Sequence, residues 1–151
     1  MKPIVANATI GYLIFWRYIF MKEKEIKVLM VEPGKAPTVT TIKNDLRSLQ
    51  EAVSIGAEYV GYIEIIGIDD DVCILCNEEG KLINLEPNRR FYQDILCGVF
   101  YVTGENSDGN LTSLPEKHIE YYSKYFATPE KLTADDVEKA MSFNIFVDWE
   151  V

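Results

Sequence analysis

The polar residues best suited to binding a ligand are concentrated between Asp69 and Arg90. Arg89 and Arg90 are the only adjacent arginines in the chain, and a guanidinium group binds phosphate or carboxylate through paired N–H donors. If the chain folds back after Pro87, these arginines approach the turn expected around Gly80. We therefore predict a nucleotide or anion site formed by six residues: Asn77, Glu78, Lys81, Asn88, Arg89 and Arg90.

A purely structural interpretation of the same stretch stays open. Glu78 and Glu79 can pair with neighbouring basic side chains on the surface, where such pairs contribute little to stability. Asn77 and Asn88 can bond to the backbone of turns. The residue types alone do not decide between a ligand site and a set of turn contacts.

The spacing of Cys73 and Cys76 resembles a zinc motif, but a zinc knuckle requires the pair to lie on a turn. On a strand, residues three apart point to opposite faces, so we predict buried thiols. The acidic run 69–71 lacks the spacing of a calcium-binding loop and is predicted to be a solvated turn. We expect no metal ion and no cofactor.

The residues offer no recognisable catalytic set. His118 is the sole histidine, and we expect it on the exposed side of a helix, with no motif tying it to a carboxylate or a nucleophile. A non-enzymatic protein is therefore the expectation.

The formal net charge is −9, and residues 104–151 hold 10 acidic and 4 basic groups. Nucleic-acid phosphates repel such a surface, so direct nucleic-acid binding is not expected. An acidic surface can instead imitate DNA phosphates and occupy the basic groove of a nuclease or repressor. The candidate residues for this alternative are Glu105, Asp108, Glu116, Glu120, Asp135, Asp136 and Glu138.

Three cysteines cannot all pair within one chain, which favours a cytoplasmic protein. The apolar run Ile10–Met21 is interrupted by Arg17 and is shorter than the ~20 residues that span a bilayer. No membrane span is therefore predicted. The run is interpreted as an extra strand or helix on the domain, as an extension preceding a start at Met21, or as a membrane-surface anchor.

Apolar and β-branched runs predict a mostly antiparallel sheet. Val72–Cys76 should form a hairpin with a return strand over residues 82–85, with Gly80 at positive φ in the turn. Pro87 should end that return strand because it has no N–H to donate. Further strands are expected over 26–31 and 38–42, as the two arms of a hairpin, and over 62–68 with a bulge at Gly67. Another is expected over 95–102 near the sheet centre, with an irregular or helical connection at 91–94.

Three helices are predicted from capping signals. Asn44 or Asp45 should cap the first, whose apolar face begins at Leu46 and continues through Leu49, Ala52 and Val53. Ser113 with Glu116, and Thr133 with Asp136, have capping-box spacing for the other two. Their apolar faces are Ile119, Tyr122 and Phe126, and Val137, Ala140 and Met141. Residues 143–151 are expected to form an edge strand or a docked tail.

These elements predict a single α+β domain, with a mostly antiparallel sheet of about five to six strands and helices packed on it. Residues 1–25 are interpreted as an N-terminal extension and 26–132 as the domain proper. Residues 133–151 should supply a C-terminal helix and tail that pack on the same domain.

Several blocks, in order, resemble the DUF3846 family: IKVLMVEPGKAP (26–37), NDLRSLQEAV (44–53), YIEI (62–65), CNEEGKL (76–82), PNR (87–89) and DILCGVFYVTG (94–104). The likeness extends from about Ile26 to Phe126. Residues 1–20, the segment 54–60 and the tail after Leu132 depart from the family pattern. The family consists of small proteins of unknown function from bacteria, mobile elements and phages, so the resemblance implies context rather than chemistry.

That context implies a non-enzymatic accessory protein of a mobile element or phage, which binds a host protein or a small anionic ligand. Counter-defence is one role of this kind. The acidic DNA mimic and the nucleotide or anion site between Asn77 and Arg90 remain the two alternatives.

Overall fold

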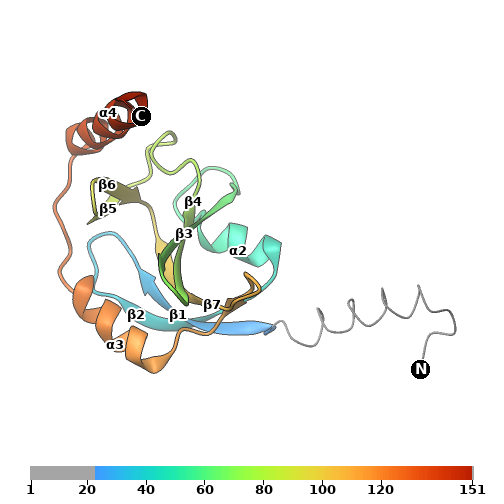
Figure 1. The fold of residues 1–151 in the computed structure, drawn as a ribbon. Coiled ribbons are helices and arrows are strands. Elements are labelled where there is room, and N and C mark those ends of the chain that lie inside the picture. Colours follow the sequence, from blue (N-terminus) through green and yellow to red (C-terminus); the bar gives the residue numbers. More distant parts are fainter. Residues whose placement is uncertain (1–22, 151) are drawn as a thin grey trace, which may run out of the picture.

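A six-stranded sheet forms the centre of the molecule (Figure 1). The computed structural model describes residues 23–150, with side chains described as far as residue 142. The strands follow the order β2 (Thr38–Lys43), β1 (Glu25–Val31), β7 (Phe100–Glu105), β4 (Val72–Asn77) and β3 (Ile63–Asp69), and β8 (Leu111–Thr112) pairs with the end of β7. All pairings of the described strands are antiparallel, which confirms the predicted α+β fold.

The inner strands β4 and β7 are buried on both faces of the sheet. Along β4, Val72, Ile74 and Cys76 pack into one core cluster, whereas Cys73 and Leu75 pack into another. Helix α3 (Glu116–Tyr125) covers the first face and α2 (Leu46–Ala52) covers the second (Figure 1). Since strands buried on both faces need apolar residues at every position, these strands are continuous apolar runs in the sequence.

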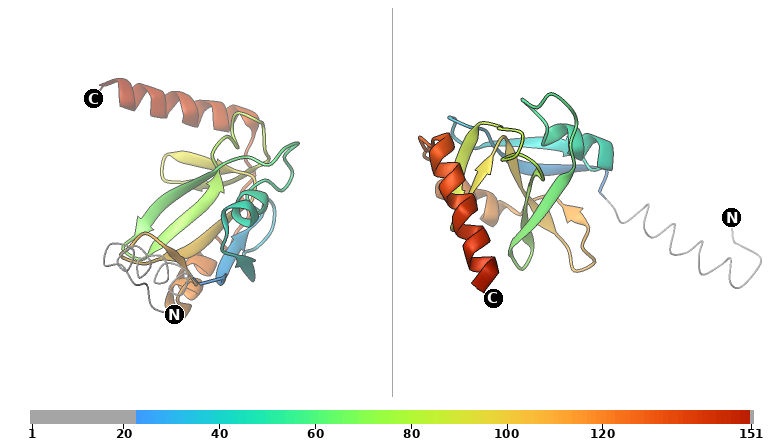
Figure 2. Two further views of the ribbon diagram at one scale, coloured as in Figure 1. Left: turned by 90° about the vertical axis from the view of Figure 1, so that its right-hand side faces the viewer. Right: turned by 90° about the horizontal axis from the view of Figure 1, so that it is seen from above.

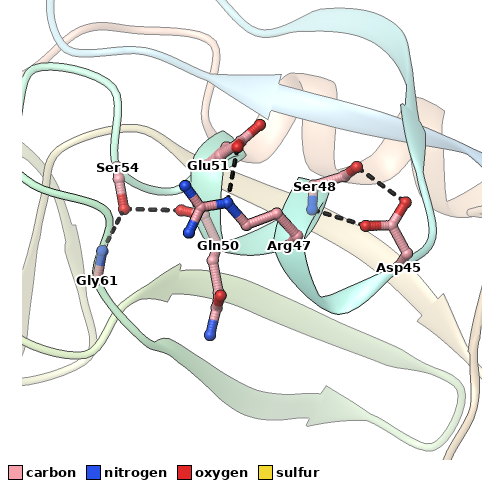
Figure 3. Close-up of polar contacts among 7 residues, drawn as sticks. All are labelled: Asp45, Arg47, Ser48, Gln50, Glu51, Ser54 and Gly61. Carbon is pink, nitrogen blue, oxygen red and sulfur yellow. Dashed lines mark hydrogen bonds and ion pairs between the residues drawn. The ribbon is translucent and has the colours of Figure 1, made fainter.

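The first predicted helix begins where its capping signal places it. Asp45 is the N-cap of α2, and its Oδ1 accepts a hydrogen bond from the Ser48 amide at 2.8 Å (Figure 3). Leu49 and Val53 are buried, but Leu46 is 62% exposed and is not part of the core. After the helix, the Ser54 hydroxyl donates to the Gln50 carbonyl and accepts from the Gly61 amide, which ties the connection to β3 back onto α2 (Figure 3).

The hairpin predicted after β4 is wrong. Residues 78–84 form successive turns instead of a return strand, because β3 and β7 already occupy both edges of β4. Gly80 is not among the residues with positive φ. It must be glycine because a Cβ there would lie 2.8 Å from the Cys97 carbonyl oxygen.

The segment after these turns forms a separate two-stranded hairpin, β5 (Pro87–Phe91) and β6 (Asp94–Cys97). Pro87 therefore begins a strand, a position where its missing N–H costs little. The connection at 91–94 is the tight turn of this hairpin, with Tyr92 at φ 54°. The strand predicted over 95–102 is divided between β6 and β7 at Gly98, which has φ 80°. Its second part, β7, does lie at the sheet centre.

The other strand predictions are confirmed, including the hairpin of β1 and β2. The register of β3 against β4 shifts between Gly67 and Asp69, which confirms the bulge.

The two C-terminal helices differ in how they begin. Pro115 is the N-cap of α3 and no side chain caps that helix, so the predicted Ser113–Glu116 capping box is wrong. Ser113 Oγ accepts instead from the Lys27 amide of β1. At α4 (Ala134–Glu150) the predicted capping box is confirmed: Asp136 Oδ2 accepts from the Thr133 amide at 2.8 Å, and Thr133 Oγ1 accepts from the Asp136 amide at 3.2 Å.

Helix α4 lies at the end of the molecule that carries β5 and β6 (Figures 1 and 2). Val137 and Ala140 are buried there against Ile95 and Cys97. The backbone stays helical as far as Glu150, so the edge strand predicted over 143–151 is wrong. Once the Thr133 cap has started the helix, each added residue contributes a further backbone hydrogen bond, so extending the helix costs less than starting it.

The interpretations offered for Ile10–Met21 lie outside the described residues. None of the helices in residues 23–150 is both long enough and apolar enough to cross a membrane.

Candidate functional site

The arginine at the centre of the predicted anion site is part of the core. Arg89 is 1% exposed. Its guanidinium donates to the carbonyls of Phe126, Lys35 and Asn88 and to Asn88 Oδ1, at 2.6 to 3.3 Å. Burial lowers the pKa of this guanidinium, and the charge of Glu130 opposes that change. All three guanidinium nitrogens of Arg89 are thus engaged by the protein itself.

Asn88 and Asn77 are engaged in the same way. Asn88 is fully buried, and its amide donates to the carbonyls of Val31 at 2.9 Å and Gly98 at 2.8 Å. Asn77 Oδ1 accepts from the Glu79 amide, and its Nδ2 donates to Val53 and Ser54. These asparagines satisfy backbone groups that would otherwise be buried without partners.

The three remaining residues of the predicted site lie apart from that buried set. Lys81 is ion-paired with Asp94 of β6, and Glu78 is exposed in the turns after β4. Arg90 points the other way from Arg89 on β5 and lines an open groove of about 310 Å³ with Gln93, Asp136 and Lys139. The structure therefore does not bring the six residues together around one space.

The cysteines and the histidine have partners inside the fold. Cys73 Sγ lies 3.1 Å from Thr103 Oγ1. His118 is only partly exposed, with Nε2 at 3.0 Å from Asp71 Oδ1, so the prediction of an exposed, unpaired histidine is wrong. The β3–β4 turn lies against α3, a contact between distant segments that no local motif reveals. Among the described residues, no group of three or more His, Cys, Asp or Glu could hold a metal ion.

The three thiols should be unreactive in the native protein. Burial raises the pKa of Cys73 to about 11, of Cys76 to about 12 and of Cys97 to about 11. Since the thiolate is the nucleophile, iodoacetamide at pH 7.5 should alkylate no cysteine of the folded protein and all three in urea. Intact-protein mass spectrometry measures this directly, and rapid labelling of one site without denaturant would contradict the buried positions.

The predicted acidic surface is scattered and partly neutralised. Four of its residues form ion pairs within the chain: Glu116 with Lys27, Glu120 with Lys124, Asp135 with Lys139, and Asp136 with Arg90. Glu105 lies beside the β3–β4 turn, where its amide donates to the Asp71 carbonyl. Asp108 lies in the loop after β7, and Glu138 is on α4. These carboxylates thus come from three parts of the surface.

A row of aromatic side chains is the most distinctive exposed feature. Tyr121 and Tyr125 on α3 have ring centroids 6.2 Å apart, Tyr125 lies 6.4 Å from Phe91 of β5, and Phe91 lies 4.7 Å from Tyr92. The exposed fractions of Tyr121, Tyr125 and Tyr92 are 58%, 51% and 82%. We call these four residues the aromatic row. Buried Phe126 lies beneath it, in contact with both Tyr125 and Phe91.

Comparison with known families gives one match, to a domain of unknown function (DUF3846), over residues 26–127. The chain belongs to the DUF3846 family. No curated protein and no solved structure matches the chain. The DUF3846 region includes the sheet, the aromatic row and the buried Asn88–Arg89 pair, whereas α4 follows it.

Sequence reasoning missed the aromatic row of this DUF3846 domain. A signal was present, because Tyr121 and Tyr125 are four residues apart and fall beside the apolar face of Ile119, Tyr122 and Phe126. Their meeting with Phe91 and Tyr92 depends on how the β5–β6 hairpin packs against α3, which the sequence does not specify.

Proposed function

We propose that the protein is a non-enzymatic accessory protein that binds a basic partner protein of its host through the aromatic row. The observation that carries this proposal is the continuity of four rings contributed by two separate elements, a helix and a hairpin tip. Single exposed tyrosines are ordinary on protein surfaces. A contiguous, firmly supported row is characteristic of an interface, because tyrosine offers a large contact area at low conformational cost.

The charge at one end of the row indicates the kind of partner. Burial raises the pKa of Tyr122, and the carboxylate of Asp69 adds to that effect. Asp71 of the β3–β4 turn lies against His118, which is on α3 like Tyr122. The β3–β4 turn therefore places carboxylates near His118 and Tyr122, and the Tyr122 ring lies 4.9 Å from Tyr121 of the aromatic row. An arginine of a partner could stack on a tyrosine while pairing with an aspartate. A second copy of this chain fits less well, since each copy has a net charge of −9.

The acidic DNA mimic has weaker support. A mimic needs an array of carboxylates available to a basic groove, whereas four of the seven candidates are paired with this chain's own lysines and arginine. The nucleotide or anion site has weaker support too, because Arg89 has no remaining donor. That the protein is encoded by a phage or mobile element is part of this proposal and is based on the family resemblance.

Affinity purification from an extract of the cells that encode the protein tests this function. Wild type is compared with the double variant Tyr121→Ala/Tyr125→Ala, and the bound proteins are quantified by mass spectrometry. The expected result is one basic protein that wild type retains and the variant loses, with its affinity lowered by at least about tenfold. Added salt should also release it, because the contact includes exposed charges.

The matched control is Tyr62→Ala/Leu82→Ala. Tyr62 and Leu82 are 67% and 70% exposed and lie outside the row. This control should retain the partner as wild type does. Equal retention by the row variant, or a retained protein that is acidic or resists salt, would contradict the proposal.

A further inference from the structure

A cavity of about 280 Å³ lies at the opposite end of β1 and β7 from the β3–β4 turn. It is independent of the aromatic row. Val31 at the end of β1 pairs with Phe100 at the start of β7, so the residues that follow and precede them, Glu32 and Val99, meet beyond the sheet. The loop after α2 and the segment before β5 complete the walls with Ile55 and Leu85.

The backbone around this cavity has an unusual conformation at three positions. Gly56, Asn84 and Gly98 have φ of 85°, 57° and 80°. A Cβ at Gly98 would lie 2.7 Å from the Cδ1 of Leu85, so glycine is what allows Leu85 to pack there. The positive φ of these three residues sets the path of the backbone around the cavity.

The cavity is lined by apolar side chains and by acidic groups. Leu85 and Val99 are 6% and 3% exposed and form the apolar part with Ile55. The polar groups are the carboxylates of Glu32 and Glu86 and the amide of Asn84, and none of the described lysines, arginines or histidine lines the cavity. Beside the cavity, Lys35 forms an ion pair with Glu32: its Nζ lies 3.6 Å from Glu32 Oε2, and its side chain is 66% exposed.

The side chain of Glu32 is 30% exposed and lines the cavity. Tyr101 is 2% exposed and donates to the Ala52 carbonyl at 2.9 Å. Burial raises the pKa of Tyr101 to about 12, and the charge of Glu32 contributes to that rise. Glu32 thus supplies negative charge close to a buried hydroxyl, in a region where water screens it less than at the open surface.

From this arrangement we infer that the cavity binds a small organic cation, an alkyl diamine or a similar alkylammonium compound. The ammonium groups pair with Glu32 and Glu86, and the methylene chain lies on Leu85, Val99 and Ile55. The oxygen of the Asn84 side chain accepts a further N–H. A volume just below the ~300–1,000 Å³ usual for ligand sites suits a ligand of this size. The exposed Lys35 is displaced from Glu32 when the ligand binds.

Isothermal titration calorimetry at low ionic strength tests the inference, with 1,4-diaminobutane as the probe. We expect saturable binding of one molecule per chain. The neutral 1,4-butanediol, which has the same length, should not bind. Glu32→Gln and Glu86→Gln should each weaken binding by at least about tenfold, because each removes a charged hydrogen-bonding partner while keeping the side chain's shape.

The matched control is Glu138→Gln, which removes the same charge from the exposed surface of α4. Its affinity for the diamine should stay within about twofold of wild type. A two-dimensional NMR spectrum of each variant establishes that it is folded, and in wild type the diamine should shift the amide signals of Leu85 and Val99. Lack of saturation at millimolar diamine, or equal weakening by Glu138→Gln, would overturn the inference.

Discussion

Replacing Arg89 by methionine should lower the free energy of unfolding by about 3–5 kcal/mol. Methionine fills much of the same space but donates no hydrogen bond. The substitution therefore leaves the buried carbonyl oxygen of Phe126 and the partly buried carbonyl oxygen of Lys35 without the partners that Arg89 supplies. Those bonds connect β5 to the end of α3 and to the β1–β2 turn. Urea unfolding followed by circular dichroism measures the loss.

Arg90 is the matched control for this experiment, since it is the same residue type one position along the strand. Its side chain is 51% exposed and lies 3.8 Å from Asp136, a contact expected to contribute less than about 1 kcal/mol. Arg90→Met should therefore change stability little. Arg89→Lys should remain clearly destabilised, because one ammonium cannot reproduce the planar array of guanidinium donors. Similar losses at Arg89 and Arg90 would contradict the buried role of Arg89.

The second large effect is expected at Phe126. Its ring is 2% exposed and packs edge-on against Phe100, with ring centroids 5.1 Å apart. Phe126→Ala should cost about 3–5 kcal/mol, because the substitution removes apolar contacts and leaves a cavity between α3 and the sheet. The backbone carbonyl that accepts from Arg89 is retained in this variant, so the measured loss reports the side chain. Thermal and urea unfolding provide the comparison.

Tyr125→Ala serves as the control for Phe126→Ala. Tyr125 is 51% exposed, and its truncation should cost less than about 1 kcal/mol while weakening the proposed partner contact. Phe126→Ala should weaken the proposed partner contact only indirectly, because the native Phe126 ring supports Tyr125 and Phe91. A Tyr125 variant as unstable as Phe126→Ala would mean that the aromatic row is part of the core, which would remove the basis of the proposed function.

The two proposals can be separated by experiment because they use different parts of the surface. Substitutions in the aromatic row leave Glu32 and Glu86 in place, and glutamine at either glutamate leaves Tyr121 and Tyr125 unchanged. Diamine binding and partner binding should therefore respond independently to these variants. Loss of both activities in a single variant would indicate unfolding.

The residues between Asn77 and Arg90 illustrate why residue type alone does not identify a site. An arginine beside an asparagine has the same donors whether it faces a ligand or the protein's own carbonyl groups. Whether these side chains face a ligand or the protein interior depends on the path of the chain after β4. Because β3 and β7 occupy both edges of that strand, the segment turns away and forms β5, which turns Asn88 and Arg89 inward.

The sequence by itself determined the features that depend on local periodicity and capping. These are the β1–β2 hairpin, the Gly67 bulge, a cap at Asn44 or Asp45, the Thr133 cap, the inward faces of α3 and α4, and the opposite directions of Cys73 and Cys76. Their causes lie within a few residues of one another. Membership of the DUF3846 family was also evident from ordered blocks of residues.

Tertiary structure alone decided which distant segments meet. It placed Asp71 on His118, brought Phe91 beside Tyr125 of α3, divided 95–102 into two strands at Gly98, and joined Glu32 to Glu86 around one cavity. Such contacts are set by the order of strands in the sheet and by the packing of helices on its faces. The same local sequence is compatible with several such arrangements, and burial of the whole core selects one of them.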